Sequence, residues 1–463
     1  MTNARSRLVP ALIYAALSTA IVSSLGMLLV PTISREMDVS VSTAQWMLTV
    51  NLLVGAIATP VMGRLSDGPH KKRLLLVSLL IILIGSLIAA TAANFTIFLI
   101  GRALQGLTYG IVPVTIALAR RYVPAKSAQA AISSLSVTVS TGIGIGYPLT
   151  GIIAGLFDFR IAFWFAALFV VTAIIVVHRL MPEGTDTQAT STPFDFTGAA
   201  LLGLGLGALL LGIGEGPNWG WVSPWTLGAF ILAAITLTAW ARLELRSDHP
   251  LINLHVLKNG EVMLANCTAV GLGAAMYIGL SISSLIAQAP ATTGYGLAMP
   301  VFWAGFVMFP LSVGSFSANR LVRRFSHRIH LATLLPIGTA AMTVAGMLLW
   351  FAHTELWQIL IGMLVLGLGM GASYAAMPAL IARSVAAEEL GSSVSFNQVL
   401  RTVGSSFGTA VAGAVLAANM APDLHPTHTG ITATLAIGAI LCLAVFVALL
   451  ARNLIARSRP VTG

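Results

Sequence analysis

Residues 44–73 read AQWMLTVNLLVGAIATPVMGRLSDGPHKKR, an apolar run of about twenty residues that ends in a basic loop. A helix of that length crosses the roughly 30 Å hydrocarbon core of a bilayer. The same unit recurs along the whole chain, whose 463 residues are 57% hydrophobic and only 9% charged. Soluble domains carry about a quarter charged residues. The sequence therefore predicts an all-α, multi-pass integral membrane protein.

Apolar run length predicts about fourteen spans. They lie near 8–31, 44–63, 73–93, 95–119, 129–156, 161–180, 196–215, 225–243, 262–287, 298–319, 330–351, 357–381, 392–419 and 431–453. An even number of spans places both termini on one side of the membrane. The run at 8–31 is too long for a cleavable signal peptide, and the short connecting loops predict no soluble domain.

The positive charges are divided unequally between the two sides. Of the 25 Lys and Arg residues, only Arg35 and Arg160 fall on the side opposite the termini, and Arg102 and Arg401 fall within spans. All others lie on the side of the termini, so both termini are predicted to be cytoplasmic, in a protein of the cytoplasmic (inner) membrane. The net charge of +10 is a topology signal, and we expect the lipid bilayer, not nucleic acid, as its partner.

The two halves of the chain share a pattern of glycines. The fourth and twelfth spans carry them at Gly101, Gly106 and Gly110 and at Gly362, Gly367 and Gly371, an offset of 261 residues. The fifth and thirteenth spans carry the pairs Gly142 and Gly146 and Gly404 and Gly408. Halves repeated about an axis along the membrane normal are typical of major facilitator transporters. This predicts two six-helix bundles, over residues 1–194 and 247–463, with helices 7 and 8 inserted at 195–246.

The loop after the second span, from Gly63 through Arg64 and Asp67 to Arg73, resembles the signature loop of the major facilitator superfamily. Gly63 permits close helix approach, and Asp67 can cap or pair at helix ends, which would hold the cytoplasmic side shut through charge-assisted hydrogen bonds. The match is incomplete, because Pro69 and His70 stand where the family has a basic residue and Gly. An ordinary positive-inside loop is the alternative.

Arg102 lies within the fourth span and is followed by Gln105 and Gly106. An arginine in hydrocarbon is costly and marks a functional site by default. The order Arg-x-x-Gln-Gly is similar to the family's fourth-helix signature, which implies a role for Arg102 and Gln105 in proton coupling. A packing role, with the guanidinium satisfied by backbone carbonyls, remains open.

The fifth span, with Gly142, Gly146 and Pro148, looks like the exporters' antiporter signature, although Tyr147 interrupts its Gly-Pro end. Together with Gly404 and Gly408 these residues are predicted to form helix pivots, because glycines allow close backbone approach and proline opens a bend. Residues 194–198, 216–221, 249–254 and 397–404 resemble the fourteen-span drug:proton antiporter family. That resemblance covers nearly the whole chain and implies multidrug efflux.

The first span contains no acid, and none of the fifteen acids falls deep in a bundle. A buried cation needs a compensating carboxylate, so neutral, zwitterionic or anionic amphiphiles fit better than polycations. Residues near mid-span are candidates for the substrate pathway, with a packing or gating role equally open for the last of them. They are Asn51, Tyr109, Tyr147, Tyr277, Trp303, Tyr374, Asn397 and Arg401.

These features predict an exporter of small amphiphilic molecules, including drugs and antibiotics, that works as a monomer by alternating access. The proton gradient would supply the energy, with no cofactor and no catalytic or metal residues. The nine histidines lie mostly in loops without zinc-type spacing, which argues against an enzyme. Two alternatives remain: a dedicated exporter of one endogenous metabolite, lipid or peptide, and a membrane sensor that does not transport.

Overall fold

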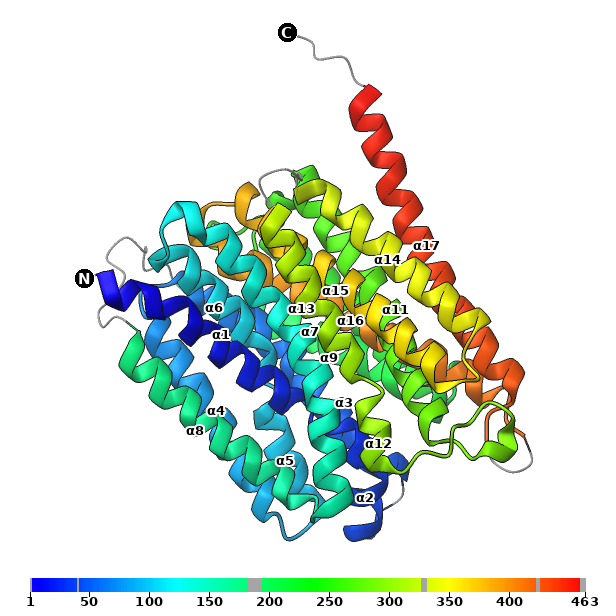
Figure 1. Cartoon of the computed structure of the whole chain (residues 1–463). Coiled ribbons are helices and arrows are strands. Elements are labelled where there is room, and N and C mark those ends of the chain that lie inside the picture. Colours follow the sequence, from blue (N-terminus) through cyan, green and yellow to red (C-terminus); the bar gives the residue numbers. More distant parts are fainter. Residues whose placement is uncertain (1, 40, 182–193, 326–330, 422–424, 459–463) are drawn as a thin grey trace.

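The computed structural model describes residues 2–39, 41–181, 194–325, 331–421 and 425–458, and over these ranges the chain is almost entirely helical. In this described part, thirteen helices are long and apolar enough to cross a membrane, and a shorter apolar helix covers Leu8–Ser24. Thirteen of the fourteen predicted spans thus correspond to such helices, and the first corresponds to the shorter apolar helix. Figure 1 shows that the chain begins and ends at the same end of the helices, hereafter the terminal face.

The first half contains eight helical segments. They are α1 (Thr2–Ser24), α2 (Val30–Glu36), α3 (Val41–Asp67), α4 (Lys71–Thr91), α5 (Phe95–Gln105), α6 (Thr108–Tyr122), α7 (Ala125–Leu156) and α8 (Arg160–Leu180), with a short 3-10 turn at Met27–Leu29. α1 packs between α7 and α8, and α4 packs against α5 and α8. Asn94 begins α5 by accepting a hydrogen bond from the backbone N–H of Ile97, which satisfies a free donor at the helix start.

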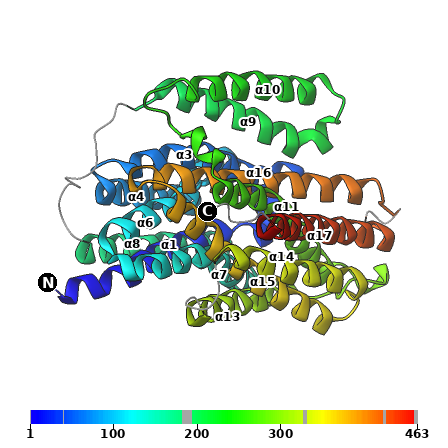
Figure 2. The same cartoon turned by 90° about the horizontal axis from the view of Figure 1, so that it is seen from above.

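The helices α9 (Phe196–Trp219) and α10 (Pro224–Glu244) form an antiparallel pair outside the main body (Figure 2). Asp195 and Ser223 cap their N-termini, and Gly220 between them adopts φ 88°, a conformation that favours glycine. α9 packs on both α3 and α16. Trp240, Leu202 and Leu251 belong to the small apolar cluster beneath the pair.

The second half repeats the arrangement of the first. Its elements are α11 (Gly260–Gln288), α12 (Val301–Phe306), α13 (Phe309–Phe325), α14 (Leu331–Phe351), α15 (Leu356–Ser384), α16 (Leu390–Ala417) and α17 (His428–Ser458), with 3-10 turns at Leu254–Lys258, Ala291–Thr293 and Ala387–Glu389. α16 packs on α11 as α7 packs on α1. The halves meet crosswise, because α3 contacts α16 and α13 contacts α7.

Three predicted spans are interrupted. The run at 8–31 ends its first helix at Ser24, the run at 95–119 divides between α5 and α6, and the run at 298–319 divides between α12 and α13. The second break has a packing reason: a Cβ added to Gly106 would lie 2.8 Å from the carbonyl oxygen of Asn51. Hydrophobic run length reports membrane crossing but not such breaks, which arise where neighbouring backbones approach closely.

Candidate functional site

The terminal face is held together by Asp67, the last residue of α3. Its Oδ1 accepts a hydrogen bond from the Gly391 N–H at 2.6 Å, and its Oδ2 accepts one from the Ser392 N–H at 2.9 Å. Both amides belong to the first turn of α16, where backbone N–H groups lack helical partners and carry partial positive charge. A carboxylate from one half therefore caps a helix of the other half.

Small residues allow this close approach. A Cβ added to Gly391 would lie 2.6 Å from the carbonyl oxygen of Gly63, and one added to Gly63 would overlap the Ser395 side chain. Ser66 and Ser395 turn their hydroxyls onto carbonyls of their own helices, Ser66 onto Gly63 at 2.6 Å and Ser395 onto Gly391 at 2.7 Å. No larger side chain fits between α3 and α16 at this level.

Further hydrogen bonds join the halves near the terminal face. Arg120, at the end of α6, donates from Nη1 to the carbonyl oxygen of Ala382 in α15 at 2.6 Å. Ser133 in α7 donates to the carbonyl oxygen of Ala375 at 3.1 Å. Lys71 donates to the backbone carbonyls of Gly68 and Asp67, which closes the end of α3. The two halves are thus hydrogen-bonded to one another at several points near the terminal face.

The rest of the signature loop borders a second cavity, of about 590 Å³, at the terminal face. Arg64 and Arg73 line it together with Asp248, Glu388 and Glu389. Asn253, in the segment after α10, donates to Glu389 Oε1 at 2.8 Å. The segment that leaves the inserted helix pair is therefore bonded to the turn that precedes α16.

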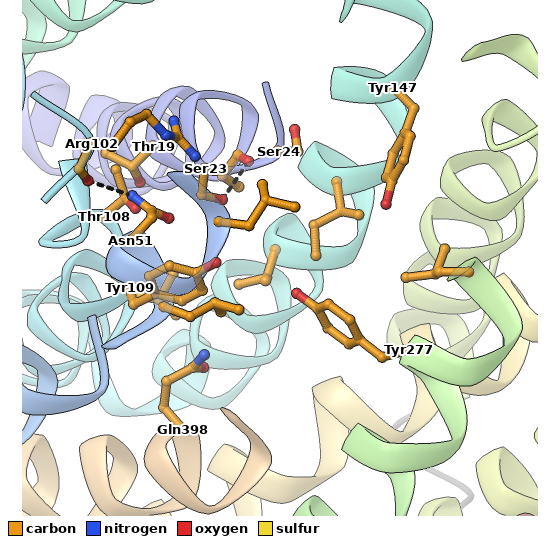
Figure 3. Close-up of a pocket in the computed structure, with 17 residues that line it drawn as sticks. Thr19, Ser23, Ser24, Asn51, Arg102, Thr108, Tyr109, Tyr147, Tyr277 and Gln398 are labelled. Carbon is orange, nitrogen blue, oxygen red and sulfur yellow. Dashed lines mark hydrogen bonds between the residues drawn. The ribbon is translucent and has the colours of Figure 1, made fainter. Parts of the chain in front are cut away.

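A central cavity of about 60 Å³ lies between the halves, and Figure 3 shows the 17 residues that line it. Tyr109 and Tyr277, from α6 and α11, turn their hydroxyls toward one another, and Tyr147 from α7 lies at the far end (Figure 3). Leucine, valine and isoleucine side chains supply much of the remaining wall. The lining residues include no Asp and no Glu.

Arg102 supplies the only formal charge among those lining residues. Its side chain is 0% exposed. Nη1 donates to Gln105 Oε1 at 2.6 Å, and Nε lies 3.3 Å from the carbonyl oxygen of Met47. Gln105 in turn donates to Ser86 Oγ at 2.8 Å, so the predicted pair Arg102 and Gln105 is one buried network.

Seven of the eight predicted pathway residues fall into two groups. Asn51, Tyr109, Tyr147 and Tyr277 line the central cavity. A second set, in the other half, consists of Tyr374, Asn397 and Arg401. The guanidinium of Arg401 lies 4.2 Å from the Tyr374 ring centroid, and the Asn397 amide donates to Asn266 and to the Ala265 carbonyl, which joins α16 to α11.

The structure corrects the prediction that Trp303 lies on the substrate pathway. It is 56% exposed on α12 and packs edge-on against Phe302, so it lies outside the cavity. Counting residues along a span gives depth in the membrane but not the face of the helix. Five polar lining residues were missed by the sequence reasoning: Thr19, Ser23, Ser24, Thr108 and Gln398. A usable signal was present, because Thr19 and Ser23 recur at four-residue spacing in a first span that lacks charge.

The candidate pivot glycines are contact points between helices. A Cβ on Gly142 would lie 2.5 Å from the Ala20 Cβ of α1, and one on Gly146 would overlap the Ser24 side chain. Gly404 and Gly408 abut the carbonyls of Val270 and Ala274 in α11. Pro148 lies inside the continuous helix α7, and the adjacent Tyr147 carbonyl oxygen lies 2.7 Å from a Cβ built on Gly305 of α12.

A sequence model of the Major Facilitator Superfamily matches residues 11–409 and, in an overlapping match, residues 312–462. The chain is similar to "Multidrug resistance protein Stp" of Mycobacterium tuberculosis (strain ATCC 25618 / H37Rv), with 25% identity over 399 residues covering 86% of this chain and 73% of that protein. It is similar to "Probable multidrug resistance protein EmrY" of Escherichia coli (strain K12), with 25% identity over 320 residues covering 68% of this chain and 60% of that protein.

This chain spans between 48% and 73% of the length of the curated relatives that it matches. Among solved structures, the fold is similar to that of the human organic anion transporter MFSD10 (TETRAN), with a TM-score of 0.65 and 15% identity. That similarity covers 96% of this chain and 99% of the other.

Proposed function

The chain belongs to the major facilitator superfamily, and from that premise we propose that it exports small amphiphilic molecules across the cytoplasmic membrane by alternating access. Relatives with about a quarter identical residues are named multidrug resistance proteins, which supports drugs and antibiotics as substrates. A dedicated exporter of one metabolite, lipid or peptide is the second candidate within transport. We further propose that one chain is the working unit.

The observation that carries this proposal is the hydrogen-bonded cap of Asp67 on α16 at the terminal face, together with a cavity between the halves deeper along the helices. A transporter that alternates must have a contact between halves that forms in one state and breaks in another. The Asp67 carboxylate bonds to two backbone amides, so the contact is specific, yet it rests on one side chain. Breaking it removes the two hydrogen bonds that join α3 to the start of α16 without disturbing the core of either half.

The distribution of Lys and Arg supports a cytoplasmic terminal face. The structure then corresponds to a state closed toward the cytoplasm. Residues 1–194 and 247–463 would be the two moving bundles. Residues 195–246 would form a helix pair that packs on α3 and α16. Residues 182–193, just before the first of these boundaries, lie outside the described part of the chain.

Coupling to protons is assigned in this proposal to Arg102 and Gln105. An arginine keeps its proton at any physiological pH, so Arg102 acts by its charge. A fixed positive charge favours the ionised form of any acid that reaches the cavity, and loss of that contact restores the acid's affinity for a proton. Binding an acid and releasing a proton would thereby become one event.

The experiment that tests the proposed function is a substrate panel in proteoliposomes. Anionic, neutral and cationic amphiphiles are each loaded, and flux is measured with and without a pH gradient. A multidrug exporter moves several unrelated members of the panel. Flux of one compound alone favours the dedicated exporter, and absence of flux for every compound, in correctly inserted protein, overturns transport in favour of a sensor.

A further inference from the structure

Arg102 is a fully buried cation whose identified partners are neutral. Its hydrogen bonds go to the Gln105 amide oxygen and to the Met47 carbonyl, and its guanidinium lies 5.8 Å from the Phe163 ring centroid. Removing a charge from water costs several kcal/mol unless an opposite charge compensates it. Hydrogen bonds to neutral groups offset only part of that desolvation energy. An anion that reaches Arg102 would therefore stabilise the buried guanidinium.

The guanidinium of Arg102 retains a hydrogen-bond donor that is not used in this state. Nη2 of Arg102 is buried without a hydrogen-bond partner, and so is the hydroxyl of Thr108. Both residues line the central cavity. Figure 3 shows the Arg102 side chain extending toward Ser23, on the cavity wall. A buried donor that lacks an acceptor costs about 1–3 kcal/mol, which a ligand oxygen at this position would recover.

The remaining charges near the cavity are also positive. Arg401 is 7% exposed and donates to the Oε1 atom of Gln398, a lining residue whose side chain points toward the cavity (Figure 3). With Oε1 engaged by Arg401, the amide NH₂ of Gln398 is left to donate. The acidic residue of α3, the helix that carries the cavity residue Asn51, is Asp67. It lies sixteen residues further on, about 24 Å away along the helix axis, and so does not offset the charge of Arg102.

Taking these observations together with the proposed export function, on which this inference rests, we propose that the central cavity selects amphiphiles carrying a single negative charge. The anionic group, a carboxylate or sulfonate, accepts hydrogen bonds from Arg102 Nη2 and Thr108. The apolar body lies against Leu48, Leu52 and Val112. One free guanidinium N–H edge accommodates one charge, so dianions are excluded by the same geometry.

The cavity volume agrees with a head-group site. About 60 Å³ is far below the roughly 300–1,000 Å³ of pockets that enclose whole drug-sized molecules. In the state seen here the cavity has room for an anionic head group alone, and the apolar body would enter when the halves separate. A permanently cationic amphiphile would meet Arg102 with no carboxylate among the lining residues to offset the repulsion.

The test uses three probes with one apolar body: 4-hexylbenzenesulfonate, its neutral isostere 4-hexylbenzenesulfonamide, and 4-hexylphenyltrimethylammonium. Their Kd values are measured by calorimetry on the full chain in lipid nanodiscs. We expect the sulfonate to bind at least about tenfold more tightly than the sulfonamide, as charge-assisted hydrogen bonds allow, and the ammonium to bind most weakly. In Arg102→Gln the sulfonate-to-sulfonamide ratio should fall to about one, because the sulfonate loses a charge-assisted hydrogen bond whereas the sulfonamide loses at most a neutral one.

Two further variants sharpen the result. Arg102→Lys keeps the charge and should keep most of the preference, which also covers the case in which Arg102→Gln fails to fold. Arg160→Gln makes the same change at a half-exposed arginine paired with Glu36 and Asp158, and should leave all three Kd values unchanged.

Wild-type protein that binds the sulfonamide or the ammonium as tightly as the sulfonate overturns the inference, as does an anion preference that survives in Arg102→Gln. Flux measurements separate this from the proposed function. Gradient-driven flux without anion preference leaves export standing and removes the anion site. Anion preference without flux of any probe leaves the site standing and removes export.

Discussion

Asp67 and Gly391, 324 residues apart in the chain, are joined by a hydrogen bond of 2.6 Å between Oδ1 of the carboxylate and the backbone N–H. The acid ends a helix of the first half, and the glycine lies in the first turn of a helix of the second half. The bond places the carboxylate at a helix N-terminus, where the helix dipole favours negative charge, and Asp67 is buried, so water screens the interaction little. It is the structural basis for expecting a gate at the terminal face.

Replacement of Asp67 by Asn should leave the protein folded and inserted but slow transport. The change keeps one acceptor oxygen and removes the charge, which weakens closure by about 1–2 kcal/mol and the closed population by a factor of about 5–30. The measurement is flux per inserted molecule. Asp158→Asn, at an exposed acid that bonds Arg160, is the matched control. Wild-type flux in Asp67→Asn would remove Asp67 from the gate.

Replacement of Gly63 by Ala should disturb the same gate by volume alone. The added methyl overlaps the Ser395 side chain and lies 2.7 Å from the Gly391 carbonyl, and overpacking of this kind costs about 1–3 kcal/mol. We expect reduced flux and greater reactivity of a cysteine placed at Ser392. Gly214→Ala, where nothing lies within 4 Å of the added methyl, should behave as wild type. Equal effects in the two variants would contradict the prediction.

Replacement of Arg102 by Ala should abolish proton-driven flux while a neutral amphiphile still binds. Arg102→Lys should retain part of the flux, because it keeps the charge but loses the planar fork that bonds Gln105 and the Met47 carbonyl. The measurement is the pH change in proteoliposomes on substrate addition, beside equilibrium binding. Pumping by Arg102→Ala with an unchanged pH dependence would make Arg102 a packing residue.

His353 should make the folded protein sensitive to acid. It lies between α14 and α15, is 4% exposed, bonds the Leu349 carbonyl through Nδ1 at 2.9 Å and stacks on His428. Burial lowers its pKa below the usual 6.5. Because the unfolded chain binds this proton at higher pH, its stabilising effect is present above about pH 6.5 and is lost as the pH falls below it.

The measurement for His353 is the thermal midpoint in detergent at pH 7.5 and 5.5. The drop on acidification should be larger in wild type than in His353→Gln. An exposed histidine, His255, provides the control substitution His255→Gln. The prediction is wrong if His353→Gln loses as much stability on acidification as wild type does.

The membrane orientation can be tested directly at Arg324, an exposed residue near the end of α13 at the terminal face. A single cysteine introduced as Arg324→Cys should react with an impermeant thiol reagent only from the cytoplasmic side. Labelling from outside alone would reverse the topology and, with it, the direction of the proposed gate.

Much of the fold followed from the sequence, because crossing a bilayer demands run lengths that few other constraints produce. The glycine pairs were equally informative: Gly142 and Gly404 pack on α1 and α11, the corresponding helices of the two halves. What run length could not give was the division of spans at Gly106 and near Val307. Those breaks depend on which backbone lies opposite.

The site was predictable in part for a related reason. Asp67, Arg102 and Gln105 stood out because charge and amides are costly within or beside the bilayer. Their partners did not, since Gly391 and Ser392 have no chemistry that marks them until α16 is placed against α3. Trp303 was misplaced because depth along a helix says nothing about rotation, whereas Tyr109 and Tyr277 from the same reasoning do face the cavity.

The central claim, proton-driven export, is tested most directly by flux of 4-hexylbenzoate in proteoliposomes, because its carboxyl group can release and regain a proton. Substrate and internal pH are recorded together, and the leak of protein-free liposomes is subtracted. The account predicts that an imposed pH gradient drives the benzoate against its concentration gradient, that substrate alone moves protons in the opposite direction, and that Arg102→Ala abolishes both signals. Benzoate movement that only follows its own concentration gradient, with no accompanying pH change in correctly oriented protein, would contradict it.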